Sequence, residues 1–381
     1  MKFVIDALGL TDGGAKVGLL RLIPLFAGQK AHQFVFLLPD LSEYAELSPS
    51  GAKMVLRSKP RSLLRRYLYL NRTLPALCKE EGADALLCFG NFVPRRPTIP
   101  TVAVVHNAYY LYQEPVAEAR ATLREKVIIR YGRYHLRHLS AGMHVIVQTE
   151  VMKRRILTLN LQQPARVTVI SDRDPLPQEW LVRMPRRTGH PSRLFTFLCL
   201  AHYGPHKNLE ILVDALKKLP THSRRSARCL ITVDPERHPR ARSLIQRINQ
   251  ERLQRTLVNL GTLSGLQLQQ AYLSADAFVM PTLLESFGRP YHEAMRSGLP
   301  ILTSDRDFAR HICQDAALYF DPLDADSVAR SMARIMEDRE LRASLVQNGK
   351  RLISRSPTWD EIAAQFVSVL EEAASIPGER V

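Results

Sequence analysis

Short runs of apolar residues recur along the chain, and each is followed by a segment whose apolar residues repeat with helical spacing. Runs that are apolar on both faces and alternate with helices are typical of parallel strands covered by helices on both sides. They are "KFVIDAL", "QFVFLLP", "DALLCF", "TVAVVH", "MHVIVQT" and "RVTVI", then "LFTFLCLA", "RCLITVD", "TLVNLG", "ADAFVMPT", "LPILTSD" and "AALYFD". The pattern predicts an α/β protein in which a doubly wound sheet occurs twice.

The length of the chain also indicates two domains, because 381 residues exceed the size at which one hydrophobic core stops growing. The stretch from Ser171 to Arg193 is rich in proline and charge, lacks a period and is expected to be a linker. We therefore predict an N-terminal domain over residues 1–180 and a C-terminal domain over 193–355. Residues 356–381 carry apolar residues at helical spacing, and we expect a helix that packs back toward the N-terminal domain.

The composition is that of a globular protein, with 45% hydrophobic and 24% charged residues. The start, "MKFVIDALGL", fits a first strand better than a signal peptide, and no apolar stretch approaches the length that spans a bilayer. The five cysteines are scattered and lack the paired spacing of a zinc or redox site. Short Asp-x-Asp runs are common by chance, so we assign no metal to those that begin at Asp172, Asp305 and Asp324. We expect a reduced, cytoplasmic protein.

The formal net charge of +16 is the unusual bulk property, and it indicates an anionic partner. The segment "RSKPRSLLRRYLYLNR" reads as a basic amphipathic helix that can lie on an anionic membrane, through Arg57, Arg61, Arg65 and Arg66. The alternative is a solvated basic face that packs on its own sheet. Arginines also crowd residues 224–255, as in some nucleic-acid-binding proteins. Because no nucleic-acid module is recognisable and aromatic residues are not interleaved, we expect no nucleic acid as partner.

Glycines follow the first predicted strand in "GLTDGGAKVGLL". Gly13 and Gly14 stand where a helix is expected to begin, and glycines there let a phosphate approach the backbone N–H groups of a helix N-terminus. The alternative is a plain turn between strand and helix. The spacing is not G-x-G-x-x-G, so nicotinamide dinucleotide chemistry is not supported.

Lys207 occupies the corresponding place in the second half, after "LFTFLCLA" and just before a helix expected near Asn208. An ammonium group and a helix N-terminus can together hold a diphosphate. A solvated lysine is the alternative interpretation.

The stretch "ESFGRPYHE" places two carboxylates around a glycine turn, directly after a predicted buried strand. Gly288 permits a turn closed to other residues, and a helix is expected to follow it. Ser286, Phe287 and Gly288 would then direct N–H groups into a cleft between the domains, while Glu285 and Glu293 face the same space. Two carboxylates suit a ligand with a ribose and a sugar, and the alternative is a pair of solvated glutamates at a helix cap.

These residues carry a resemblance to a known family. "ESFGRPYHEAMRSGLPILTSD" resembles the Glu-seven-residues-Glu motif of the retaining glycosyltransferases of family 4, which have the GT-B fold of two Rossmann-like domains facing across a cleft. "PHKN" is similar to the diphosphate-binding region of that family, and "DAALYFDPLD" with the tryptophan-bearing last helix matches its C-terminal end. "VVHNAYYLY" and "VIVQTEVMKRRIL" look like segments of bacterial O-antigen and exopolysaccharide transferases.

The resemblance implies roles for the residues on the donor side. Glu293 would bind the ribose hydroxyls, Lys207 and Gly14 the diphosphate, and Glu285 with the N–H groups of Phe287 and Gly288 the transferred sugar. His202 stands where the family commonly has an arginine, which puts one phosphate contact in doubt. The donor-binding residues implied in this way are Gly13, Gly14, His202, Lys207, Ser286, Phe287, Gly288 and Glu293.

His106 and Glu285 are the catalytic residues that the resemblance implies. His106 ends the strand "TVAVVH" and is similar to a histidine near the reacting centre, where it can hydrogen-bond the donor sugar or the acceptor. The alternative is a satisfied histidine at a strand end. His311 stands where the family often has a glutamate, so the polar network on the donor side differs from that of the family.

The expected function is transfer of a sugar, with retention, from a UDP- or GDP-sugar to a lipid-linked or saccharide acceptor. The pathway would be cell-surface polysaccharide or lipopolysaccharide biosynthesis, at the inner face of the cell membrane. Lys207 and the helix termini would stabilise the leaving diphosphate by electrostatics, so neither a metal nor a cofactor is expected. An inert relative that serves as an assembly subunit remains the first alternative and a basic nucleic-acid-binding protein the second, whereas non-hydrolysing epimerases of the same architecture have different motifs.

Overall fold

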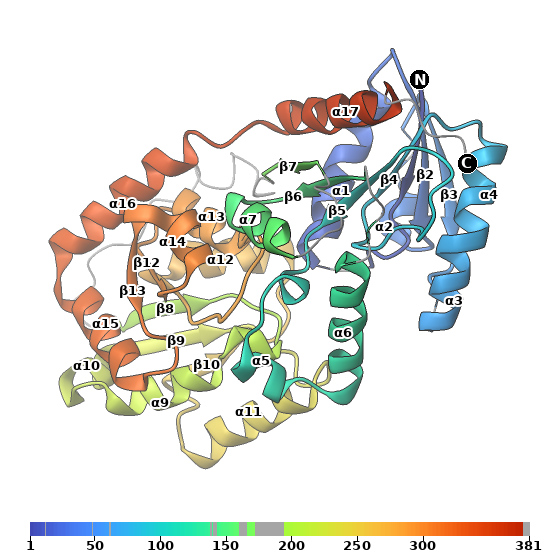
Figure 1. The fold of residues 1–381 in the computed structure, drawn as a ribbon. Helices are drawn as coiled ribbons and strands as arrows, with labels where there is room; N and C mark the ends of the chain where they lie inside the picture. Colours follow the sequence, from blue (N-terminus) through green and yellow to red (C-terminus); the bar gives the residue numbers. More distant parts are fainter. Residues whose placement is uncertain are drawn as a thin grey trace. The chain divides into compact units, whose positions relative to one another are not determined.

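A computed structural model describes residues 1–381 except 12, 48, 61, 138, 140–142, 160–165, 172–193 and 376–381. The chain divides into two compact units (Figure 1). Unit 1 comprises Met1–Tyr112, Leu123–Pro175 and Pro357–Val381, and unit 2 comprises Gln113–Thr122 and Leu176–Ser356. The chain therefore leaves unit 1 for a ten-residue segment of unit 2 and returns to unit 1. It then passes into unit 2 again and comes back to unit 1 at its end.

Unit 1 is built on a parallel sheet of seven strands in the order β3-β2-β1-β4-β5-β6-β7. The strands are β1 Lys2–Asp6, β2 Gln33–Pro39, β3 Ala52–Arg57, β4 Ala85–Cys88, β5 Thr101–Val105, β6 His144–Val147 and β7 Val167–Val169. Every residue of β4, β5 and β6 is buried, as expected of strands covered on both faces.

Helices connect the strands of unit 1 and cover its sheet. They are α1 Gly13–Ala27, α2 Ser42–Ala45, α3 Leu63–Leu68, η1 Tyr69–Thr73, α4 Leu74–Glu80, η2 Ala108–Tyr110, α6 Leu123–Arg137, α7 Glu150–Thr158 and α17 Trp359–Ser375. The last helix, α17, packs beside α1 against β4 and β5. Phe366 of α17 meets Phe26 of α1 edge to face, with ring centroids 6.1 Å apart, so the end of the chain contributes to the core of unit 1.

Unit 2 repeats this plan with a parallel sheet of six strands in the order β10-β9-β8-β11-β12-β13. The strands are β8 Phe195–Cys199, β9 Ala227–Ile231, β10 Leu257–Asn259, β11 Ala277–Met280, β12 Ile301–Ser304 and β13 Ala317–Phe320. Counted from the first strand of each unit, the order is the same in both up to the sixth strand. The predicted doubly wound α/β fold, present twice, is confirmed.

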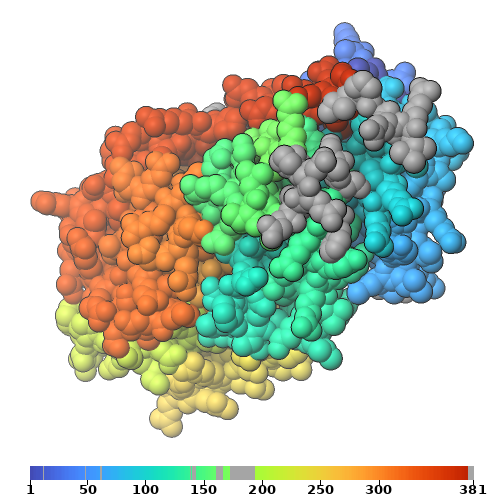
Figure 2. All heavy atoms as spheres, viewed as in Figure 1, coloured from blue at the N-terminus to red at the C-terminus, as the bar shows by residue number. Residues whose placement is uncertain are grey.

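The helices of unit 2 include one, α5, that comes from the first half of the chain. They are α5 Pro115–Arg120, η3 Pro205–Lys207, α9 Glu210–Lys218, α10 Thr221–Ser226, α11 Pro239–Gln250, α12 Gly265–Ser274, α13 Arg289–Arg296, α14 Asp307–Cys313, η4 Gln314–Ala316, α15 Ala325–Glu337 and α16 Arg339–Ile353. The arginine-rich segment of this unit contains α11, which lies at the surface (Figure 2, yellow).

All the predicted apolar runs contain a strand, but the sequence did not reveal β3. Within the described part of the chain this strand pairs only with β2, and its residues are half-buried or exposed, so it lacks a run that is apolar on both faces. Arg57 is the last residue of β3 and does not belong to the predicted basic helix, which begins at Leu63. The predicted linker lies outside the described residues except for Ser171, and Arg61 also lies outside them. No helix of the described residues is long and apolar enough to cross a membrane.

Candidate functional site

Lys207 and Glu285 form an ion pair in unit 2, with Nζ of the lysine 2.6 Å from Oε2 of the glutamate. Lys207 ends η3, after β8, and Glu285 lies in the loop after β11. Because β8 and β11 are neighbours in a parallel sheet, the loops after them meet at its carboxyl edge. Each side chain is about 15% exposed, so solvent screens the pair only in part.

Two further hydrogen bonds join the loop of Glu285 to the turn of Lys207. The hydroxyl of Thr282 and the N–H of Leu283 both donate to the carbonyl oxygen of His206, at 3.0 and 2.7 Å. Desolvation, and then the neighbouring Lys207 ammonium, hold the pKa of His206 well below its ordinary value. The imidazole is therefore neutral near pH 7, and Lys207 carries the positive charge of this turn.

Gly288 makes the turn that starts α13. Its φ is +69°, and a Cβ built on it would lie 2.6 Å from the ring of Tyr291, so no other residue fits without strain. Pro290 follows in the first turn of the helix. The N–H of Ser286 donates to Oε1 of Glu285 at 3.1 Å, so this amide is directed at the carboxylate.

The ring of Phe287 stacks on His292, with centroids 4.3 Å apart and planes at 12°. Tyr291 is fully buried, and its hydroxyl lies 2.6 Å from Oγ1 of Thr303 on β12. Aromatic contacts and this hydrogen bond therefore hold α13 against the sheet.

Glu293 lies on α13 and is only 9% exposed. The hydroxyl of Tyr272, on α12, donates to its Oε2 at 2.6 Å and orients the carboxylate. Sequence reasoning missed Tyr272, because nothing in its local sequence distinguishes it from other helical tyrosines that fill a core.

The corresponding edge of unit 1 carries the other predicted residues. Gly13, with φ +76°, and Gly14 begin α1 after β1, and both are exposed. His106 follows β5 and is held by Asn91, whose Oδ1 accepts the N–H of His106 at 2.8 Å and whose Nδ2 lies 3.0 Å from His106 Nε2. His106 also lines a cavity of about 30 Å³ together with Gly18 of α1.

Asp6, at the end of β1, is buried in the same unit, and sequence reasoning assigned it no role. Burial raises its pKa to about 6, while the hydroxyl of Tyr69, which donates to Oδ1 at 2.9 Å, opposes the rise. Arg66 lies nearby, donating to the carbonyl of Gly90 at 3.1 Å with its guanidinium carbon 4.0 Å from the centroid of Phe92. The interpretation of Arg66 as a membrane-facing residue is therefore wrong, because its side chain packs inward.

The two histidines that depart from the family pattern both lie in unit 2. His202 is exposed in the loop between β8 and η3, and His311 is half-buried on α14. Among the described residues, no three or more His, Cys, Asp or Glu side chains are grouped so as to hold a metal ion.

Comparison with known proteins gives a family match over residues 183–352, to the glycosyl transferases group 1. The chain is 28% identical over 228 residues to a serotype-specific mannosyltransferase of Escherichia coli, covering 55% of this chain and 26% of that protein. It is 30% identical over 199 residues to the phosphatidyl-myo-inositol mannosyltransferase of Mycolicibacterium smegmatis, covering 49% of this chain and 47% of that protein. The chain thus spans less than half the length of each of these curated relatives.

A solved structure of similar fold is that of HepE from Anabaena in complex with UDP-glucose. It superimposes with a TM-score of 0.72 at 16% identity, over 98% of this chain and 100% of that one. At this identity the likeness concerns the fold alone, and the fold shared with such neighbours is GT-B.

Proposed function

We propose that this chain, whose residues 183–352 match the group 1 glycosyl transferases and whose fold is GT-B, transfers a sugar from a nucleotide sugar to an acceptor. The observation that carries the proposal is the carboxyl edge of unit 2. There Lys207 and Glu285 lie in the segments that follow β8 and β11, and Glu293 lies on α13 directly after the second of them, all within the matched segment. This edge is where open α/β sheets bind their ligands.

Lys207 binds the diphosphate of the donor in this proposal. A lysine ammonium has three N–H donors, so one can remain with Glu285 while the others reach phosphate oxygens. The positive charge stabilises the leaving group as negative charge builds on it, and a metal ion is not required for this step. Gly14, at the start of α1 in unit 1, is the second diphosphate contact, while His202 replaces the guanidinium of the family pattern with an exposed imidazole.

The glutamates recognise hydroxyl groups. Glu293, oriented by Tyr272, accepts hydrogen bonds from the ribose hydroxyls. Glu285 and the N–H groups of Phe287 and Gly288 hold the transferred sugar. Glu285 thus serves both the sugar and the lysine that holds the diphosphate, which couples the two halves of the donor.

The reaction breaks the bond between the anomeric carbon of the sugar and the phosphate oxygen, and the nucleoside diphosphate leaves with the electron pair. The acceptor hydroxyl forms the new bond on the face from which the diphosphate departs, so the anomeric configuration is retained, and its proton passes to the leaving phosphate. His106, fixed by Asn91, hydrogen-bonds the donor sugar or the acceptor.

The donor is a UDP- or GDP-sugar, and the acceptor is a saccharide or a lipid-linked saccharide used for cell-surface polysaccharide. The names of the relatives motivate this choice, since they include a serotype-specific mannosyltransferase and a lipid mannosyltransferase, and a neighbour of the same fold was solved with UDP-glucose. The two glutamates contact ribose and sugar rather than the base, so both nucleotides are consistent with the site.

Unit 1 would bind the cytoplasmic face of a membrane. Leu63, Leu64, Tyr67 and Leu68 of α3 are 38 to 68% exposed, and Arg65 on the same helix is exposed as well. An apolar face flanked by basic residues suits an anionic lipid surface. With Arg66 turned inward and Arg57 on β3, this proposal rests on Arg65 and the apolar residues of α3.

Calorimetric titration and thermal-shift measurements of the purified protein with UDP, GDP, ADP and dTDP test the proposal. We expect one diphosphate to bind and to raise the apparent stability, by about 2.7 kcal/mol at a ligand concentration 100 times Kd. Glu293→Ala should abolish this response, whereas the control Glu340→Ala, at an exposed position of α16, should keep it. Absence of binding to all four ligands would contradict the proposal and favour an inert assembly subunit.

A further inference from the structure

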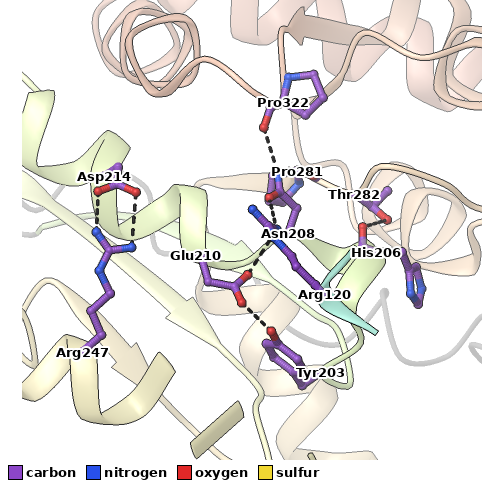
Figure 3. Close-up of polar contacts among 10 residues, drawn as sticks. All are labelled: Arg120, Tyr203, His206, Asn208, Glu210, Asp214, Arg247, Pro281, Thr282 and Pro322. Atoms are coloured by element: carbon purple, nitrogen blue, oxygen red, sulfur yellow. Dashed lines mark hydrogen bonds and ion pairs between the residues drawn. The ribbon is translucent and has the colours of Figure 1, made fainter. Parts of the chain in front are cut away.

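The segment Gln113–Thr122 lies between η2 and α6 of unit 1 along the chain but belongs to unit 2. Its helix α5 contacts η3, the turn that ends at Lys207. The last residue of α5 is Arg120, and Figure 3 shows its side chain reaching toward Asn208 and Glu210. Helix α5, which comes from the first half of the chain, thus packs against the turn that ends at Lys207.

Both the nitrogen and the oxygen of the Asn208 side-chain amide form hydrogen bonds in unit 2. It is 1% exposed, and its φ of +54° lies in the left-handed region, which asparagine tolerates better than most residues. Its Nδ2 donates to the carbonyl oxygens of Pro322, at 2.7 Å, and Pro281, at 3.2 Å. Because both of these partners are acceptors, the amide orientation is determined, and Oδ1 must face a donor.

Arg120 is that donor, with Nη1 2.7 Å from Oδ1 of Asn208. The carboxylate of Glu210 lies 3.6 Å from Nη1 and balances its charge, and the hydroxyl of Tyr203 donates to the same carboxylate (Figure 3). The side chains of Arg120 and Glu210 are 25% and 20% exposed, so the network is largely shielded from water. Without Arg120, a buried oxygen of Asn208 would lose its partner.

We propose that Arg120 is a positioning residue that holds Lys207 in place through Asn208. Asn208 directly follows Lys207, and it bonds Pro281, where the loop that carries Glu285 begins. It therefore ties together the two loops whose charged residues pair. The importance of Lys207 for the donor rests on the proposed function, whereas the contacts of Arg120 and Asn208 do not.

The accessibility of Lys207 tests the positioning without any donor. The protein is treated with a limiting amount of acetic anhydride, and the acetylation of Lys207 is measured by peptide mass spectrometry relative to the exposed Lys350. We expect Arg120→Met to raise the relative rate at Lys207 several-fold, and Arg120→Lys, which keeps the positive charge and N–H donors without the planar guanidinium, to restore part of the protection. An unchanged rate in Arg120→Met would overturn the proposal, whether or not the protein binds a nucleotide.

Arg247→Met is the matched control. Arg247 also forms ion pairs in unit 2, with Asp214 and Glu251, and Figure 3 draws its pair with Asp214 apart from the network of Asn208. This variant should lose a comparable charged contact and leave the labelling of Lys207 unchanged. An equal rise in both variants would indicate general loosening of unit 2 and would overturn the specific role of Arg120.

Binding of the nucleotide selected by the titration measures the consequence for the site. We expect Arg120→Met to weaken it roughly tenfold, in line with the loss of one buried charged hydrogen bond. In the background of Lys207→Ala the same change should have no further effect, because Arg120 acts through the lysine. Additive effects in the double variant would contradict the proposal. If the wild type binds no nucleotide, the proposed function fails and the labelling experiment alone decides the role of Arg120.

Discussion

The two units share one strand order, yet the carboxyl edges of their sheets are built differently. In unit 2 the first strand leads to a lysine paired with a carboxylate from the loop after the neighbouring strand, and hydrogen bonds join the two segments. In unit 1 the first strand ends in a buried aspartate bonded to a tyrosine, with an arginine stacked over a phenylalanine. The same architecture thus holds a paired charge cluster in one unit and a desolvated acid in the other, and the loops rather than the fold account for the difference.

The two edges also respond to pH in opposite senses. Burial raises the pKa of Asp6 to about 6, so its contribution to the stability of unit 1 is lost as pH rises from about 4 toward 7. Desolvation lowers the pKa of His206, so its contribution to unit 2 is present above the ordinary histidine pKa and lost as pH falls. Acidification should therefore favour this edge of unit 1 and disfavour that of unit 2.

Removing the ammonium group of Lys207 in unit 2 should have the largest effect. We expect Lys207→Ala to lower the rate of sugar transfer by about 100- to 1,000-fold, because the leaving diphosphate loses a positioned charge. The measurement is kcat/KM with the nucleotide sugar chosen from the titration. The control Lys217→Ala, which removes an ion pair with Glu251 in the same unit, should leave the rate within about twofold of the wild type. A loss smaller than tenfold in Lys207→Ala would contradict the role of this edge.

Distorting the turn at Gly288 in unit 2 should have the second largest effect, a loss of stability. Gly288→Ala places a Cβ 2.6 Å from the ring of Tyr291 at a φ of +69°, so strain and overpacking should together lower the free energy of unfolding by about 3 to 4 kcal/mol. Gly261→Ala is the matched control, because its φ is +68° but no atom of the described residues lies within 4 Å of the added Cβ. Urea unfolding should give about 1 kcal/mol for the control, and equal losses would rule out the contact with Tyr291 as a cause.

Neutralising the buried acid of unit 1 should have a smaller effect that depends on pH. A pKa raised from 3.8 to about 6 corresponds to at most about 3 kcal/mol of destabilisation at neutral pH, which Asp6→Asn removes while keeping an acceptor for Tyr69. Relative to the wild type, we expect the variant to gain about 2 kcal/mol in free energy of unfolding between pH 4.5 and pH 7.5. Urea titrations at the two pH values measure it, and a difference independent of pH would show that Asp6 does not titrate in this window.

The smallest effect should come from the surface of unit 1. Arg65→Gln is expected to weaken binding to vesicles that contain phosphatidylserine by about fivefold, which corresponds to about 1 kcal/mol for one basic residue near an anionic surface. Arg240→Gln, at an exposed position of α11 in unit 2, should change it little. Equal losses in the two variants, measured by co-sedimentation, would mean that the net charge rather than α3 attracts the lipid.

The fold was largely predictable because its strands are buried on both faces and therefore appear as continuous apolar runs. The exception, β3, is an edge strand whose residues are half-buried or exposed, so it does not appear as a continuous apolar run. The pattern around Glu285 and Glu293 likewise identified a turn and a helix, and the structure places both there. The catalytic and binding roles of these residues stay predictions until the variants are measured.

Contacts between distant segments could not be read from the sequence. Tyr272 on Glu293, Asn91 on His106 and Arg120 on Asn208 join residues that are 15 to 88 positions apart, and none carries a local signal. The interpretation of the Arg66 side chain as membrane-facing was wrong for the same reason, since a helical pattern indicates which residues share a face but not what each side chain packs against.

By itself, the sequence determined the alternation of strands and helices and the turn at Gly288, because apolar periodicity and glycine chemistry are local properties. Only the tertiary structure decided that Lys207 pairs with Glu285, that Asp6 is desolvated, and that Gln113–Thr122 belongs to unit 2. The physical reason is that charge pairing and burial depend on which loops a parallel sheet brings together, and that arrangement is a property of the folded chain.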